Sequence, residues 1–341
     1  MNKTAHPNRR KRNFRVRPFH IVVGLVVILL VIGTVVVNSL KGWDGSERFT
    51  IIFQSEEESL NPGNPVGLLS VEPREGEAVY FSIPGNTMME VPFGYQSYPI
   101  YSIYSLGSLD SKRGGGYLLA RSIENSLGTL VDGYWIRKGK SDPSVPQSRD
   151  DLIKVKKSYF SFFGLLTNLF SSVTRGYRED VSLSWRDKIR IWNTIRTLRL
   201  DQIQYISLSN SGLLSPEQLP DGTTVFQLDR DGFDLKISRY FEDSKIREEN
   251  YSIEIVNAAD EERLASGWAR ILEHLGLNVI AVTNGKIPDS GRCEISVMQK
   301  SLMDSFTVLR LVSALDCKVS LIPDENLRSD LLIRLGKAFI Q

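Results

Sequence analysis

Residues 66–87 read VGLLSVEPREGEAVYFSIPGNT. Two apolar runs, Val66–Val71 and Ala78–Ile83, flank a charged hexapeptide that contains Pro73 and Gly76. Because Pro and Gly within a short polar stretch between two β-rich runs are typical of a tight turn, we predict a β-hairpin here. The second strand of this hairpin continues directly into the polar turn 82–87.

Further elements on either side of the hairpin indicate a mixed α/β domain. Phe49–Phe53 and Val131–Ile136 are short β-rich runs, and Gly114–Gly116 precedes the helix-like segment Tyr117–Leu127. Ser184 and Asp187 have the spacing of a capping box before a helix with apolar residues at near-helical spacing. We then predict a strand over Gln202–Leu208 and a loop over Ser209–Gly222 that closes the first domain.

From Tyr251 onward, strands and helices alternate. We predict helices over Asp260–Leu275, which Gly276 ends, and over Leu302–Leu315. The predicted strands are Ser252–Val256, Val279–Val282, Arg292–Val297, Lys318–Ile322 and Leu331–Leu335. This alternation indicates a smaller layered α/β domain.

The N-terminal region has the pattern of a membrane anchor. Ile21–Val37 holds seventeen residues without a charge, and with its flanks the segment 19–40 reaches the roughly 20 residues that a spanning helix needs. A cluster of basic residues precedes it: Arg9, Arg10, Lys11, Arg12, Arg15 and Arg17. Because such residues stay in the cytoplasm, we expect the N-terminus inside and about 300 residues outside. The alternative, a cleaved signal peptide, fits less well because the apolar stretch is long and lacks a small-residue cleavage site.

Composition limits the remaining function classes. The net charge is +2, and the basic excess lies largely in the N-terminal tail, so nothing predicts a nucleic-acid partner. With three His and two Cys residues, no transition-metal cluster is expected. Cys293 and Cys317 could pair outside the cytosol, but the sequence leaves that pairing open.

The segment Asp151–Phe170 combines lysines with an aromatic and aliphatic face. Such a pattern fits a helix that packs on the protein core, which we favour, and also a helix that lies in the membrane interface. The residues do not decide between the two.

In the first exported domain the motifs resemble those of the LytR-CpsA-Psr family of envelope proteins. The family's core domain has a hairpin that ends in Ser-Ile-Pro-Arg-Asp-Thr, a Gly-Gly turn that opens a helix, and an Ile-Asp-x-Tyr strand. This chain has corresponding motifs in the same order: Ser82-Ile83-Pro84-Gly85-Asn86-Thr87, Gly114-Gly115-Gly116 and Val131-Asp132-Gly133-Tyr134. The resemblance implies transfer of a lipid-linked glycan phosphate onto peptidoglycan, with arginines that bind phosphate, aspartates that assist a metal ion and a hydrophobic groove for polyprenyl chains.

The C-terminal region is similar to the LytR-type C-terminal domain. The matching motifs are Glu254-Ile255-Val256-Asn257, the run from Leu272 to Val279, and the strand from Leu332 to Phe339. No catalytic residues are assigned to that domain in the family, so its implied role is binding. Packing on the neighbouring domain is an equally open alternative.

Two departures affect the expected chemistry. Gly85 stands where the family has an arginine, and Asn86 where it has an aspartate. A guanidinium binds pyrophosphate through paired charge-assisted hydrogen bonds, and a carboxylate favours magnesium, so both losses weaken a transfer site. The other arginines of the region are candidates by proximity only, and helix-surface charge is their expected role: Arg175, Arg178, Arg186, Arg190 and Arg196.

We therefore predict no catalytic residues and no resident cofactor, with magnesium needed only if the chain is a transferase. The glycine run lacks the Gly-Lys-Ser/Thr of a phosphate loop, so we interpret it as a turn that opens a helix. The start of that helix beside Lys112 and Arg113, together with Asn86 and Thr87, is our candidate anion or glycan-phosphate site.

The expected architecture is α/β, with a transmembrane helix, a degenerate LytR-CpsA-Psr-like domain and a LytR C-terminal-like domain. The predicted limits are 1–18 for the basic tail, 19–40 for the anchor, 47–210 for the first domain, 211–249 for a connecting segment and 250–341 for the second domain. The expected function is a non-catalytic envelope protein that binds wall glycan, peptidoglycan, a polyprenyl-linked precursor or a wall-synthesis partner. The alternative is a phosphotransferase that attaches lipid-linked glycopolymer to peptidoglycan.

Overall fold

The computed structural model describes residues 26, 28, 29, 31–33, 42–55, 65–138, 145–161, 178–285, 288–322 and 328–339. The predicted basic tail and most of the predicted anchor lie outside these residues, so both stay predictions. Within the described residues, no helix is long and apolar enough to span a bilayer.

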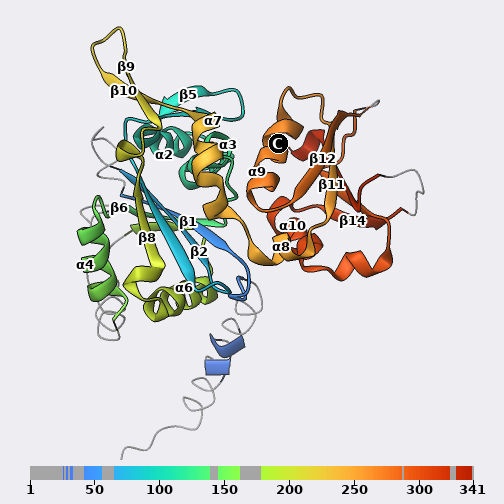
Figure 1. Cartoon of the computed structure of the whole chain (residues 1–341), viewed down its shortest axis with the longest axis horizontal. Coiled ribbons are helices and arrows are strands. Elements are labelled where there is room, and N and C mark those ends of the chain that lie inside the picture. The colour runs from blue at the N-terminus through green and yellow to red at the C-terminus, as the bar shows by residue number, and fades with distance from the viewer. Residues whose placement is uncertain are drawn as a thin grey trace, which may run out of the picture.

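A six-stranded mixed sheet organises the first region (Figure 1). Its order is β7 (Arg178–Val181), β6 (Gly133–Lys138), β1 (Phe49–Ser55), β2 (Val66–Glu72), β3 (Glu77–Ile83) and β8 (Ile203–Ser207). The predicted hairpin is confirmed, because β2 and β3 pair antiparallel with Val66 opposite Ile83 and Glu72 opposite Glu77. Gly76 has a φ of +67° in the turn, a left-handed conformation that glycine adopts without a steric cost. β6 runs parallel to β1, and β8 runs parallel to β3.

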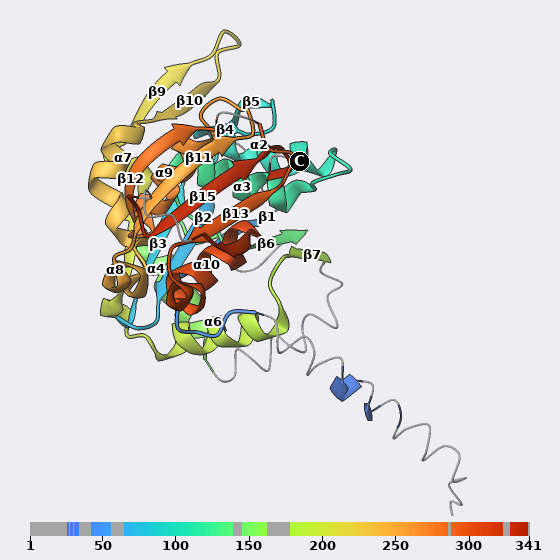
Figure 2. The same ribbon diagram turned by 90° about the vertical axis from the view of Figure 1, so that its right-hand side faces the viewer.

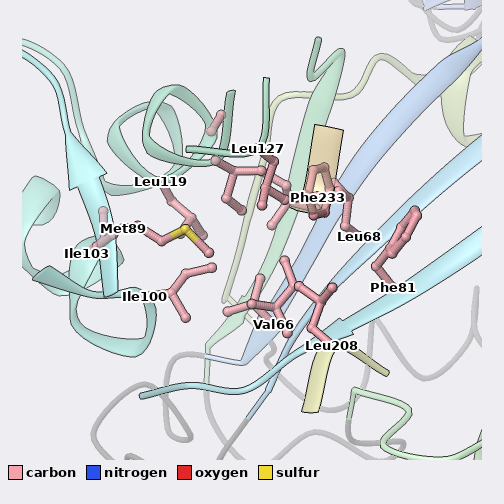
Figure 3. Packing of buried hydrophobic residues seen from close by; sticks show 14 of the residues in the cluster. Val66, Leu68, Phe81, Met89, Ile100, Ile103, Leu119, Leu127, Leu208 and Phe233 are labelled. Carbon is pink, nitrogen blue, oxygen red and sulfur yellow. The ribbon is translucent and has the colours of Figure 1, made fainter. Parts of the chain in front are cut away.

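Alternate residues of these strands face two separate cores. On one face, Val66, Leu68 and Phe81 pack against the helices α2 (Ile100–Ser108) and α3 (Gly115–Leu127). Figure 3 shows these side chains filling the space between sheet and helices. The small hairpin of β4 (Met88–Val91) and β5 (Gln96–Pro99) lies beside α2 and α3.

The opposite face of the sheet is covered by α6 (Trp185–Thr197) and, in part, by α4 (Arg149–Tyr159). The predicted capping box of α6 is confirmed: Asp187 N donates to Ser184 Oγ at 3.2 Å, and Ser184 N donates to Asp187 Oδ2 at 2.8 Å. No residue of α4 is fully buried, and residues 162–170 of the predicted segment 151–170 lie outside the described residues. Whether that segment is a core or an interfacial helix therefore stays open.

The chain after β8 differs from the prediction. The predicted loop 209–222 contains a strand, because β9 (Leu214–Gln218) forms a hairpin with β10 (Thr224–Leu228), which projects from the body in Figure 1. The following elements are α7 (Arg230–Ile237), a 3-10 turn Ser238–Phe241 and α8 (Ser244–Glu249). Phe233, Ile237 and Phe241 are buried in the same core as Leu68. The core of the first region thus extends past residue 210 to Phe241, into a segment that we expected only to connect.

The second region is the predicted layered α/β unit. Its five-stranded sheet has the order β12 (Asn278–Asn284), β11 (Ser252–Ala258), β15 (Leu331–Gly336), β13 (Cys293–Val297) and β14 (Lys318–Leu321). The two helices, α9 (Leu264–His274) and α10 (Phe306–Leu315), begin four residues later than predicted. For α9 the reason is that Asp260 and Arg263 have left-handed φ values of +61°. For α10 a 3-10 turn, Lys300–Asp304, precedes Ser305, whose hydroxyl caps the helix by accepting from Val308 N.

Cys293 and Cys317 form a disulfide, with 4.5 Å between their Cα atoms. The reason is the sheet register: Glu294 pairs with Lys318 across the parallel strands β13 and β14, which places the two preceding cysteines side by side. The sequence left this pairing open, and only the strand order decides it.

The helices α9 and α10 lie between the second sheet and the first region, as both views show (Figures 1 and 2). From α9, Arg270 binds Asp234 of α7 through two hydrogen bonds of 2.7 and 2.6 Å and donates to the carbonyls of Asn125 and Ser126. The two regions are therefore joined by directed polar contacts between helices.

Candidate functional site

The turn that follows β3 is held by backbone hydrogen bonds. Thr87 N donates to Pro84 O at 3.0 Å, while Ile100 N and Tyr101 N donate to Thr87 O and Gly85 O at 2.9 and 3.0 Å. Free N–H groups at a helix start attract anions. At α2, the first two of these groups are already bound to the turn.

Asn86 is bound to the projecting hairpin. Its Nδ2 donates to Thr224 O at 2.9 Å, and its backbone carbonyl accepts from Phe226 N at 3.0 Å. The adjacent Thr87 is fully buried and forms a β-bridge with Phe226. The side chain of Asn86 thus fixes β10 onto the turn.

A magnesium ion does not fit these residues well. Mg²⁺ prefers carboxylate and phosphate oxygens in octahedral geometry, and Asn86 supplies at most one neutral amide oxygen. Within the described part of the chain, no group of three or more His, Cys, Asp or Glu side chains is placed to hold a metal ion.

Lys112 and Arg113 lie in the loop between α2 and α3, around Asp110. Arg113 donates to Asp110 Oδ2 at 3.2 Å and lies over the ring of Phe93 at 4.2 Å. The hydrogen bond from Lys112 N, aided by those from Arg113 and Tyr95, holds the pKa of Asp110 below its ordinary value. Asp110 therefore stays ionised and neutralises Arg113, while the side chain of Lys112 is exposed.

The glycine run is confirmed as a turn that opens a helix. Gly114 has a φ of +80° and precedes the first residue of α3. A Cβ atom at Gly115 would collide with the backbone carbonyl of Tyr104, and one at Gly116 would collide with the ring of Tyr134. These glycines allow α3 to approach α2 and β6 closely, which explains them without a phosphate ligand.

The four predicted site residues fall into two pairs. Asn86 and Thr87 contact β10, whereas Lys112 and Arg113 contact Asp110 and the β4–β5 turn. Among the described residues, no hydrogen bond or ion pair joins one pair to the other. Their shared role in binding an anion stays a prediction.

Three of the five arginines that were candidates by proximity lie away from this turn. Arg186, Arg190 and Arg196 lie on α6, which packs on the opposite face of the sheet from α2 and α3. The guanidinium of Arg196 lies over the ring of Trp192 at 5.3 Å. Arg175 and the side chain of Arg178 lie outside the described residues.

Sequence reasoning missed three buried oxygens, two at the end of β1 and one in the turn. Gln54 Oε1, Ser55 Oγ and Thr87 Oγ1 have no hydrogen-bond partner within the described part of the structure. Gln54 also donates from Nε2 to Tyr101 O at 3.3 Å, which links the end of β1 to the start of α2. The available signal was the polar Gln54-Ser55 pair at the end of an otherwise apolar strand. Buried oxygens of this kind are usually satisfied by water or a bound hydroxyl group.

A second feature that the sequence could not show is a buried ionic network where the two regions meet. Arg310 of α10 is 5% exposed and donates to Asp132 Oδ1 at 2.6 Å and to Arg48 O at 3.2 Å. Its Nε lies 3.5 Å from Glu47 Oε2. Asp132, from the family-like motif before β6, therefore serves as the partner of an arginine from the second region.

Arg48 extends this network on its other side. Its guanidinium donates to the carbonyls of Glu242 and Tyr240 and lies 3.5 Å from Glu72 Oε2. Its backbone N–H donates to Asp243, whose other carboxylate oxygen caps α8. The network fixes the start of β1 to α8 and α10.

The protonation of Glu47 makes this network sensitive to pH. Burial raises the pKa of Glu47 from 4.5 to about 7, although Arg310 acts in the opposite direction. Between pH 4.5 and 7 the folded state therefore binds more protons at this position than the unfolded state, so its stability falls as the pH rises. Glu47→Gln should remove this contribution, which is on the order of 2 to 3 kcal/mol.

Urea unfolding of the wild type and Glu47→Gln at pH 5 and pH 7.5 measures the effect. We expect the wild type to lose more stability than the variant between these two values. Equal losses would show that Glu47 titrates in the folded protein as it does in the unfolded chain.

A polar cavity of about 140 Å³ lies at the other end of β3 from the turn. Both acidic and basic side chains line it, including Glu75, Glu77, Arg239 and Arg247. Arg247 is paired with Glu75 and Glu242 at 2.9 and 3.0 Å. The cavity therefore offers no apolar path for a polyprenyl chain.

No protein-family model matches the sequence, and no curated protein matches it. Solved structures that are similar to this chain include proteins of the LytR-CpsA-Psr family. Bacillus subtilis TagT has 16% identity and a TM-score of 0.37, over 58% of this chain and 92% of TagT. Bacillus subtilis TagV has 12% identity and a TM-score of 0.42, over 68% of this chain and 99% of TagV.

A further similar structure is the LytR-CPS2A-psr family protein YwtF (TagT) with bound octaprenyl pyrophosphate lipid. It has 17% identity and a TM-score of 0.36, over 58% of this chain and 91% of that one. With identities this low and TM-scores below 0.5, these matches describe a partial likeness of fold and establish neither family membership nor function.

Proposed function

We propose that this chain is a non-catalytic protein of the bacterial cell envelope. It is anchored in the cytoplasmic membrane by residues 19–40, with both α/β regions outside, and binds a wall glycan, a lipid-linked precursor or a wall-synthesis partner. The absence of catalysis is inferred from the turn 84–87, where Gly85 supplies no charge and the side chain of Asn86 is bound to the backbone of β10.

Phosphoryl transfer depends on positioned charges more than on any other protein contribution. Cations and metal ions stabilise the charge that develops on the phosphoryl oxygens, and their removal lowers the rate by orders of magnitude. Two arginines of this region are already paired with carboxylates: Arg113 with Asp110, and Arg230, which follows β10, with Glu90 of β4. Among the residues that the structure describes, the geometry therefore supports a turn without the electrostatic part of a transfer site.

The packed first core adds support. Large side chains of this core are fully buried between the sheet and helices, among them Phe81, Met89, Tyr104 and Phe233. A bound polyprenyl chain would need to displace several of them. Recognition through exposed polar groups, such as Lys112, is more compatible with this packing.

The disulfide supports the envelope location. Structural disulfides form and persist in oxidising compartments and are rare in the cytosol. The bond between Cys293 and Cys317 agrees with the outward orientation that the basic tail and apolar stretch predict.

The experiment uses the full chain in nanodiscs with a lipid-linked glycan and magnesium. We expect no cleavage of the pyrophosphate bond above background, whereas a LytR-CpsA-Psr protein that keeps the arginine and aspartate should give turnover under the same conditions. Turnover by this chain would support the transferase alternative instead.

A parallel measurement follows binding of the same glycan and of peptidoglycan. We expect the chain to bind at least one of these materials and Lys112→Ala to weaken that binding. Lys154→Ala on α4 is the control, because it also removes the charge of an exposed lysine. If the chain binds neither material, a wall-synthesis protein remains as the proposed partner class, and the glycan part of the proposal is wrong.

A further inference from the structure

The helix α6 exposes an apolar pair to solvent. Trp185 and Ile189 lie one turn apart and are 53% and 45% exposed, on a different side of the helix from the buried residues Ile191 and Ile195. Arg196 is exposed and falls on the same helix face as Ile189, two turns further along. A helix that lies in a membrane interface has exposed Trp and Ile side chains together with basic residues, which here include the partly exposed Arg186, Lys188 and Arg190.

The chain that enters the first sheet is fixed to the beginning of this same helix. Trp43 is 3% exposed, and its backbone N–H donates to Asp187 Oδ1 at 2.6 Å. Gly42 has a φ of +129°, and a Cβ atom there would lie 2.7 Å from Ser184 Oγ. Residues 42 and 43 therefore pass directly over the first turn of α6.

The short distance along the chain limits how far α6 can be from the bilayer. From Leu40, where the predicted anchor ends, to Trp43 there are three residues, which span at most about 11 Å when fully extended. The interfacial layer on each side of the hydrocarbon core is itself about 5 to 8 Å thick. In both views the described helical residues 31–33 lie beyond the end of the molecule that carries α6 (Figures 1 and 2).

We propose that the exposed face of α6 rests on the outer surface of the membrane, with Trp185 and Ile189 among the lipid headgroups and Arg196 near anionic lipid phosphates. This inference rests on the proposed anchor and adds a second, peripheral contact to it. Weak contacts are sufficient, because the anchor already holds the helix at a high effective concentration next to the bilayer.

The docked orientation has a consequence for the candidate site. The β9–β10 hairpin, to which Asn86 is bound, projects from the end of the molecule opposite α6 (Figures 1 and 2). The seven residues of β3 alone span roughly 20 Å or more along the sheet. The turn 84–87 therefore faces the wall and not the bilayer.

The test uses the full chain in nanodiscs that contain anionic phosphatidylglycerol. The two cysteines of the sequence pair with each other, so an introduced cysteine supplies the free thiol for a nitroxide label. A label at Ile189→Cys reports on α6. The matched control is Leu235→Cys on α7, because the side chain of Leu235 is 86% exposed. We expect the ratio of oxygen to nickel-chelate accessibility to be several-fold higher at 189 than at 235, and to fall when Arg196→Glu is added.

The outcomes separate the two proposals. If the chain inserts into nanodiscs but the label at 189 is as accessible to the nickel chelate as the label at 235, the docking of α6 is wrong and the anchor stands. A label at 189 that is shielded from both reagents would indicate a protein contact and would also overturn the docking. If the chain does not insert, both the anchor and the docking are wrong.

Discussion

Arg310→Ala should lower the free energy of unfolding by about 3 to 5 kcal/mol, because it leaves the buried carboxylate of Asp132 without its counter-charge. The side chains of its partners, Asp132 and Glu47, are only 8% and 19% exposed. The loss should appear in urea unfolding of the full chain in mild detergent, followed by tryptophan fluorescence.

Two further variants distinguish the loss of a buried ion pair from a general effect of removing arginine. Arg292→Ala removes an exposed pair with Asp316 and should cost no more than about 1 kcal/mol. The double variant Arg310→Met with Asp132→Asn should lose less stability than Arg310→Ala alone, because few unpaired charges then remain. If Arg310→Ala and Arg292→Ala cost the same, the network does not hold the two regions together.

Phe233→Ala should also cost about 3 to 5 kcal/mol, which is the usual effect of removing a buried aromatic side chain. Phe233 is fully buried in the first core and lies 6.2 Å from Phe241, ring centre to ring centre. Urea unfolding gives the measurement, and the neighbouring Leu235→Ala is the control, since Leu235 is 86% exposed.

Leu235→Ala should change stability by no more than about 0.5 kcal/mol. The comparison tests whether residues 211–249 belong to the first core. If that segment only connected two domains, as the sequence suggested, both substitutions would have the same small effect.

Much of the local structure was predictable because it depends on neighbouring residues. The hairpin 66–83, the capping box of Ser184 and Asp187, and the glycine turn before α3 each depend on residues within a few positions. The prediction failed where distant contacts outweighed local signals. Pro216 and the surrounding polar residues predicted a loop over 209–222, yet residues 214–218 of it pair with β10.

The candidate site was only partly predictable for the same reason. The sequence identified Asn86, Thr87, Lys112 and Arg113, but it could not show that Asn86 binds Thr224 or that Asp110 neutralises Arg113. It also gave no signal for Arg310, because the partners of that residue lie 178 and more positions away.

The sequence by itself determined the α/β class, the hairpin 66–83 and the absence of charge at Gly85, because these follow from composition and short-range pattern. The tertiary structure alone decided which charges meet, that the two cysteines are joined, and which side of α6 remains exposed next to Trp43. The physical reason is that burial and pairing depend on how separate elements pack. The residues around one position in the sequence do not show which distant residues it will contact.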